Sequence, residues 1–136
     1  MFKIDPAQDS FKSYMLNGNY YVDKTEMIYE YLEKWFESKI MFTRPRRFGK
    51  TMIMTMFRDF LDIKQKGNDL FKGLKIMEHV ECVNKYMHQY PVLFISFKEM
   101  KGESAADLLD SIRVEVSKLA ESHNELADSA NISDTA

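Results

Sequence analysis

The residues best suited to chemistry lie in one short basic stretch, residues 44–51, which reads RPRRFGKT. Its last three residues, Gly49, Lys50 and Thr51, match the end of the phosphate-binding pattern G-x-x-x-x-G-K-[ST]. In that pattern the glycine lets the backbone approach the phosphates, the lysine reaches the β- and γ-phosphates, and the threonine hydroxyl reaches Mg²⁺. A helix that begins at Lys50 would add N–H groups that favour an anion. The stretch therefore predicts a site for nucleotide phosphates.

This stretch departs from the general pattern at its first glycine, because Arg44 stands in that position. A Gly-Lys-Thr tripeptide alone is weak evidence, and the residues could instead form a basic surface turn capped by Thr51. A further alternative is a positive cluster that binds nucleic-acid phosphates. Its members are Arg44, Arg46, Arg47, Lys50 and Arg58. Arginines in such a loop more often serve the bound triphosphate or pair with acids, so nucleic-acid binding is the less favoured alternative.

The elements around this stretch are those that the pattern requires. The apolar run 40–43 (IMFT) predicts a buried strand before the loop. After the loop, apolar residues recur at helical spacing and predict a helix from about Lys50 to Asp62. These residues are Met52, Ile53, Met56, Phe57, Phe60 and Leu61. The predicted order of strand, basic loop and helix favours the phosphate site over the surface turn.

The rest of the chain predicts three more helices and one more strand. Apolar spacing indicates helices over 24–37, over about 78–88, and over 104–122. Asp23 and Glu26 form a capping-box pattern before the first of them. The run 91–97 (PVLFISF) is apolar nearly throughout, as in a strand buried on both faces of a parallel sheet. Residues up to Tyr20 read as irregular. Alternating strands and helices predict an α/β fold.

Composition sets the broad class of protein. With 136 residues, of which 45% are hydrophobic, the chain can build one core. A net charge of −2 gives no general attraction to nucleic acid or anionic membranes. No apolar run is long enough to cross a bilayer, and the single cysteine, Cys82, fits a buried thiol in a reducing compartment. His79, His88 and His123 lack metal-ligand spacing. We therefore expect a cytoplasmic protein that contacts no membrane.

Several stretches in order resemble the predicted AAA-ATPase-like family. They are residues 20–25 (YYVDKT), 42–51 (FTRPRRFGKT), 70–76 (LFKGLKI), 90–92 (YPV) and 96–98 (SFK). Within that family the loop is itself written R-P-R-R-F-G-K-[ST], so Arg44 agrees with the family pattern. Members typically carry an N-terminal P-loop ATPase domain, often joined to a region resembling PD-(D/E)XK nucleases. The resemblance covers the chain from about Tyr20 to Lys101.

The resemblance implies a nucleotide site for ATP and Mg²⁺ in the basic loop. Its cofactor-binding residues would be Arg46, Arg47, Phe48, Gly49, Lys50 and Thr51, with Thr51 reaching Mg²⁺ through the bound nucleotide. The box 20–25 would lie near the nucleotide base or at the entry to the domain. The alternative for this box is structural: Asp23 caps a helix, and Tyr21 and Val22 belong to the core.

Hydrolysis also needs an apolar strand that ends in an acid, and no such strand is recognisable here. We therefore expect no catalytic residue and weak or absent hydrolysis, in an incomplete P-loop NTPase-like three-layer α/β fold. The expected domain spans 1–123, the N-terminal part of a parallel sheet with flanking helices, followed by a polar tail at 124–136. The family's acidic strand and nuclease-like region would be missing from a truncated member. Its uncovered sheet edges would favour self-association, so a non-enzymatic interaction module or inactive remnant is the alternative function.

Overall fold

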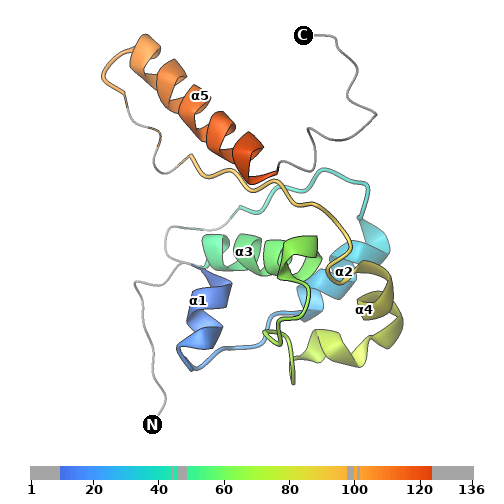
Figure 1. The fold of residues 1–136 in the computed structure, drawn as a ribbon. Coiled ribbons are helices and arrows are strands. Elements are labelled where there is room, and N and C mark those ends of the chain that lie inside the picture. The colour runs from blue at the N-terminus through green and yellow to red at the C-terminus, as the bar shows by residue number, and fades with distance from the viewer. Residues whose placement is uncertain (1–9, 44, 46–48, 98–99, 101, 124–136) are drawn as a thin grey trace. The chain divides into compact units, whose positions relative to one another are not determined.

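The computed structural model describes residues 10–43, 45, 49–97, 100 and 102–123. It divides into two compact units, Met1–Val92 and Leu93–Ala136, and each is described by itself. The helices of the first unit are α1 (Phe11–Leu16), α2 (Glu26–Lys34), α3 (Lys50–Leu61) and α4 (Val80–Tyr86), with short 3₁₀ helices η1 (Ile63–Gln65) and η2 (Lys75–Glu78) (Figure 1). The second unit contributes α5 (Ala105–Ser122).

The predicted α/β fold with a parallel sheet is wrong for the described part of the chain. Both predicted strands, 40–43 and 91–97, have no regular secondary structure there. The single β-type pairing among the described residues is an isolated parallel bridge between Asp62 and Tyr90. A strand needs a neighbouring strand to satisfy its backbone groups, and neither apolar run has one. The apolar composition of these two runs was therefore not sufficient to predict a sheet.

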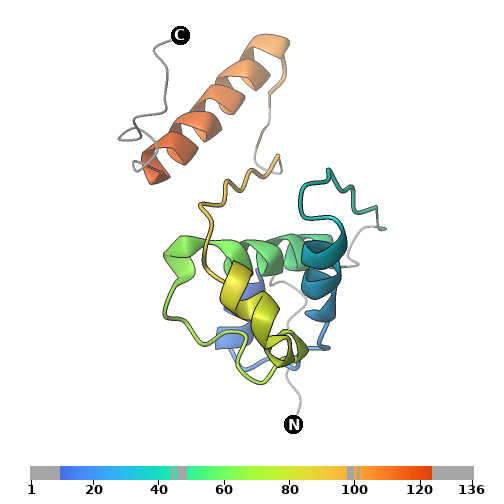
Figure 2. The same ribbon diagram turned by 90° about the vertical axis from the view of Figure 1, so that its right-hand side faces the viewer.

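The core of the first unit is a cluster of aromatic and aliphatic side chains from α1, α2, α3, η2, α4 and the segment with Leu70 and Phe71. Figure 2 shows the helices of this unit gathered together. Phe11, Phe60 and Phe71 are fully buried in it. The Phe71 ring stacks on Phe11 at 5.0 Å between centroids and meets Phe60 edge-on at 5.3 Å. Ile28 of α2 and Met56 of α3 are buried in the same cluster. This core fixes the position of α3.

The predicted helices are confirmed, although several boundaries differ. The first predicted helix is the shorter α2, and the weakly periodic one is α4 preceded by η2. The helix after the basic loop begins at Lys50, as predicted, and ends one residue earlier. Helix α1 was missed, because its six residues carry little periodicity. It is held by the burial of Phe11 and by long-range contacts.

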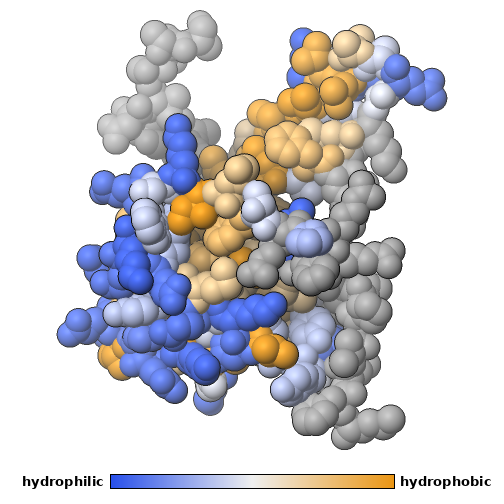
Figure 3. Space-filling model, turned by 180° about the vertical axis from the view of Figure 1, so that it is seen from behind, coloured by the Kyte–Doolittle hydropathy of each residue, from blue (hydrophilic) through white to orange (hydrophobic). Residues whose placement is uncertain are grey.

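The second unit exposes most of its apolar side chains. Ser104 and Asp107 form a capping box at the start of α5, and none of the helix's residues is buried. Leu109 and Val116 are each about half exposed, and Figure 3 shows apolar side chains gathered along this helix. In the segment before it, Phe97 is 73% exposed. Stability of the second unit therefore depends little on a core of its own.

Candidate functional site

The basic loop leads into α3 through a glycine in the left-handed conformation. Gly49 has φ 78° and ψ 21°, and its carbonyl accepts the first helical hydrogen bond, from Ile53 N at 2.9 Å. Among the described residues, a Cβ at this position would meet Met52 Cβ, at 4.0 Å. The positive φ favours glycine here, because other L-residues adopt it at a cost of about 1–2 kcal/mol.

Lys50 and Thr51 form the exposed start of α3. Both side chains are exposed, and the first turn contains no acidic residue. No described side chain caps this end, and Thr51 lies within the helix, so it does not cap a turn. The N-terminus of the helix carries partial positive charge and free N–H donors. Of the other predicted cofactor-binding residues, Arg46, Arg47 and Phe48 lie outside the described residues, as does Arg44.

Behind this exposed turn, Thr55 connects α3 to α1. Its hydroxyl is buried and is directed to the carbonyl oxygens of Thr51 at 2.9 Å and Met52 at 3.1 Å. The same oxygen accepts a hydrogen bond from Phe11 N at 3.0 Å. The sequence reasoning missed Thr55, although its position four residues after Thr51 places it on the same side of the helix.

The box 20–25 has a structural role that the sequence did not reveal. One oxygen of Asp23 accepts hydrogen bonds from Thr25 N at 2.9 Å and Thr25 Oγ1 at 2.6 Å. Its other oxygen accepts from Lys75 N at 2.7 Å, and Thr25 Oγ1 accepts from Ile76 N at 3.1 Å. These bonds join the box to η2. The N-cap of α2 is Thr25 without a side-chain cap bond, so the predicted capping box is wrong.

Tyr21 and Val22 behave differently from each other. The Tyr21 hydroxyl contacts Met56 Sδ at 3.1 Å, and its ring meets Phe11 edge-on at 5.3 Å. Burial is the main reason that the pKa of Tyr21 rises to about 12. Val22 is 60% exposed. The core assignment therefore holds for Tyr21 and is wrong for Val22.

Arg58 does not lie beside Lys50 in one positive cluster. The two residues are eight positions apart on α3, which corresponds to about 12 Å along the axis. Arg58 is in the last turn, where its Nη2 pairs with Asp59 Oδ1 at 2.8 Å. Asp59 is fully buried, and its Oδ2 has no hydrogen-bond partner among the described residues. Burial raises the pKa of Asp59, and the adjacent Arg58 opposes this effect.

A polar hollow of about 370 Å³ lies between α2 and α4. It is lined by Tyr29, Glu33, Glu78, His79, Val80, Glu81 and Cys82. The His79 ring stacks on Tyr29 at 3.7 Å, and its Nε2 bonds Glu26 Oε1 at 2.8 Å. Cys82 is a buried thiol, as predicted. Among the described residues, no three His, Cys, Asp or Glu side chains are placed to hold a metal ion.

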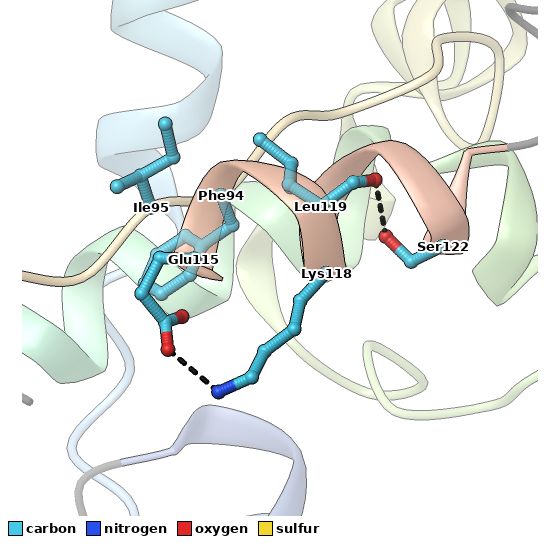
Figure 4. A pocket seen from close by; sticks show the side chains of 6 residues that line it. All are labelled: Phe94, Ile95, Glu115, Lys118, Leu119 and Ser122. Carbon is cyan, nitrogen blue, oxygen red and sulfur yellow. Dashed lines mark hydrogen bonds and ion pairs between the residues drawn. The ribbon is translucent and has the colours of Figure 1, made fainter. Parts of the chain in front are cut away.

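A second hollow lies in the other unit, between α5 and the segment before it (Figure 4). Phe94 and Ile95 line one side, and Glu115, Lys118, Leu119 and Ser122 line the other. Its volume of about 190 Å³ is below the usual range for small-molecule sites. Glu115 and Lys118 already pair at 2.8 Å. This hollow is therefore a poorer candidate than the start of α3.

Comparisons with known proteins identify a family. None of the described helices is both long and apolar enough to cross a bilayer. A comparison with curated proteins gave no match, and neither did one with solved structures. A family model described as "Predicted AAA-ATPase" matches residues 7–135, nearly the whole chain, and the protein therefore belongs to this AAA-ATPase-like family.

Proposed function

We propose that this protein binds ATP with Mg²⁺ through the basic loop and the start of α3. The observation that carries the proposal is the left-handed Gly49 directly before an exposed Lys50 and Thr51, at a helix start that no described side chain caps. Membership of an AAA-ATPase-like family is consistent with a nucleotide as ligand. The proposal rests on the loop and the helix, and it requires no sheet.

The donors at this helix start fit a nucleotide triphosphate. Lys50 would place its ammonium group on the phosphates, and the backbone N–H groups of the first turn would donate hydrogen bonds to anionic oxygens. Thr51 would supply a hydroxyl to Mg²⁺ that is held mainly by the nucleotide. Arg46, Arg47 and Phe48 complete the proposed cofactor-binding set from the sequence. Bound Mg²⁺ would neutralise charge on the phosphates.

The proposed activity is binding, with weak or no hydrolysis. Hydrolysis needs an acid that orients the attacking water, and the sequence shows no apolar segment of the kind that presents one. We therefore assign no catalytic residue. Phosphate release should be close to the rate without protein, and a fast Lys50-dependent release would contradict this part of the proposal.

Thermal unfolding with and without Mg-ATP tests the binding. At a ligand concentration of about 100 times the Kd, binding to the folded state alone adds about 2.7 kcal/mol. For a domain of this size that corresponds to an increase in Tm of about 10 °C or more. Lys50→Ala removes a charged contact to the phosphates and should weaken binding by about 10–100-fold, so that between about half and most of the shift disappears.

Lys72→Ala is the matched control, because Lys72 is an exposed lysine of the same unit outside the loop. It should keep the full shift with Mg-ATP. Absence of a shift in the wild type, or an equal shift in Lys50→Ala, would refute the proposal. Binding of DNA that weakens with salt and needs no Mg²⁺ would favour the nucleic-acid alternative instead.

A second candidate function is self-association, favoured by the exposed apolar residues of the second unit. We propose that the face of α5 that carries Leu109 and Val116, rather than sheet edges, would mediate it. Leu109→Glu should then reduce the mass measured by light scattering. Val114→Glu is the matched control, because Val114 is equally exposed but lies about 140° away around α5. A concentration-independent monomer in the wild type would exclude this candidate.

A further inference from the structure

Thr55 occupies the boundary between the exposed start of α3 and the core. Lys50 and Thr51 are exposed, whereas Ile53, Thr55 and Met56 are buried. The first turn of a helix is held less firmly than its interior, because its N–H groups have no partners within the helix. Thr55 is thus the first buried polar side chain behind the proposed phosphate-binding turn.

The Thr55 hydroxyl uses both its donor and its acceptor capacity. Its proton is shared between the carbonyl oxygens of Thr51 and Met52, at 2.9 and 3.1 Å. Its lone pair accepts from Phe11 N at 3.0 Å, a buried hydrogen bond between residues 44 positions apart. A threonine that bonds the preceding turn within its own helix is common. The long-range donor on the same oxygen is what makes this one unusual.

Phe11 N is held in a fixed position, so its hydrogen bond fixes the position of the Thr55 hydroxyl. The Phe11 ring is fully buried, stacked on Phe71 and edge-on to Tyr21. Its amide is one of the N–H groups at the start of α1 that the helix itself cannot satisfy. One hydroxyl therefore joins an aromatic core contact to the carbonyl of Thr51, the residue proposed to reach Mg²⁺.

We propose that Thr55 is a positioning residue for the phosphate site: through Phe11 N it holds the first turn of α3, and with it Lys50 and Thr51, in the geometry that binds Mg-nucleotide. This inference rests on the proposed nucleotide binding. It predicts that loss of the hydroxyl weakens nucleotide affinity beyond its effect on stability. It also predicts that the effect is greatest when Mg²⁺ is present, because Thr51 is the proposed contact to the metal.

Thr55→Val removes the hydroxyl at nearly constant volume, and Thr55→Ser keeps it. Thr25→Val is the matched control, because Thr25 is also a buried threonine whose hydroxyl accepts a long-range backbone N–H, that of Ile76. The bond of Thr25 connects the start of α2 to η2 and does not involve α3. The measurements are calorimetric titrations with Mg-ATP and with ATP in EDTA, each at a temperature where the variant is folded by circular dichroism.

We expect Thr55→Val to weaken Mg-ATP binding about fivefold, the effect of one net hydrogen bond. Its ratio of Mg-ATP affinity to metal-free ATP affinity should fall, whereas Thr55→Ser should keep the wild-type ratio. Thr25→Val should lower Tm but change affinity less than twofold. If Thr55→Val does not fold, Thr55→Ala carries the same expectation with better helix propensity.

Three results would overturn the assignment of Thr55 while leaving nucleotide binding intact. They are wild-type affinity in Thr55→Val, an equal loss in Thr25→Val, and failure of both Thr55→Val and Thr55→Ala to fold. The last would make Thr55 a folding residue. By contrast, a wild type that does not bind, or a Lys50→Ala variant that binds normally, would refute the proposed function itself.

Discussion

Replacing Asp23 should separate a structural role from a functional one in the box 20–25. Its carboxylate accepts hydrogen bonds from Thr25 N, Thr25 Oγ1 and Lys75 N, at 2.9, 2.6 and 2.7 Å. The bonds to Thr25 are local, but the bond to Lys75 spans 52 residues and fixes η2 against α2. Asp23→Ala removes both acceptor oxygens and with them all three bonds, whereas Asp23→Asn keeps one uncharged acceptor oxygen.

The expected cost of Asp23→Ala is about 2–3 kcal/mol. A hydrogen bond to a charged group contributes about 1.5–3 kcal/mol. The Lys75 amide is exposed, so water replaces part of its lost bond. The bonds to Thr25 are part-buried but local, and we assign them a similar share of the loss. Asp23→Asn should cost about 1 kcal/mol. For a unit of this size, 2–3 kcal/mol corresponds to a Tm lower by roughly 10–20 °C.

The pH dependence should identify the ionised carboxylate as the stabilising form. Burial opposes ionisation, but hydrogen bonds from Thr25 and Lys75 outweigh it and hold the pKa of Asp23 below its ordinary value of 3.8. The unfolded chain therefore takes up the proton first as the pH falls. This contribution is present above pH 3.8 and is lost as the pH falls through the lowered pKa. Asp23→Asn should lack this part of the acid destabilisation.

Urea unfolding followed by circular dichroism, at pH 7 and at several values from pH 5 to pH 2, measures both effects. Asp69→Asn is the control, because Asp69 is an exposed aspartate of the same unit. A loss below about 0.5 kcal/mol in Asp23→Ala, the range of ordinary surface substitutions, would refute the structural role. The structural role would also be refuted if Asp23→Asn lost stability at acid pH as steeply as the wild type. Weaker Mg-ATP binding at full stability would instead place Asp23 near the nucleotide.

Other perturbations have equally definite outcomes. Burial raises the pKa of Asp59 above 3.8, so the folded state holds this proton more tightly than the unfolded chain does. Stability should therefore fall as the pH rises from 3.8 through the raised pKa, and Asp59→Asn should reduce this fall in urea titrations. Burial lowers the pKa of His88 below 6.5, so stability should decline as the pH falls below 6.5, and His88→Asn should remove that decline. Phe71→Ala should cost about 3–5 kcal/mol and unfold much of the first unit, as seen by tryptophan fluorescence and circular dichroism. Ser104→Ala should remove the cap of α5 at a cost of about 1 kcal/mol, visible as faster amide hydrogen exchange in that helix alone.

The helices were predictable from sequence because their signals are local. The basic loop ends at Gly49, and the apolar spacing after it predicted the start of α3 at Lys50. Helix α5 shows the same strong periodicity, although its capping box at Ser104 and Asp107 was not used in the prediction. Helix α1 could not be predicted in this way, because it depends on contacts of Phe11 with Thr55 and Phe71, 44 and more residues away.

The sheet was the part that sequence patterns could not decide. An apolar run such as 91–97 fits a buried strand, but a strand also requires hydrogen-bonding neighbours that the run itself does not specify. In the structure Tyr90 makes one bridge to Asp62, and the described residues that follow join no strand. The partners of Asp23 and Thr25 could not be predicted from local patterns either, because Lys75 and Ile76 lie more than 50 positions later.

The stretches that resemble the family fall into two groups according to the contacts of their side chains within the fold. The stretches 20–25 and 70–76 contact each other, since the side chains of Asp23 and Thr25 accept hydrogen bonds from the backbone N–H groups of Lys75 and Ile76. Lys50 and Thr51 differ, because both are exposed and neither side chain makes a hydrogen bond among the described residues. Among the described residues of the first unit, no packing contact calls for a lysine and a threonine at those positions. These two residues are therefore the ones that we propose to contact nucleotide, which is why Lys50→Ala is the most informative single substitution in this chain.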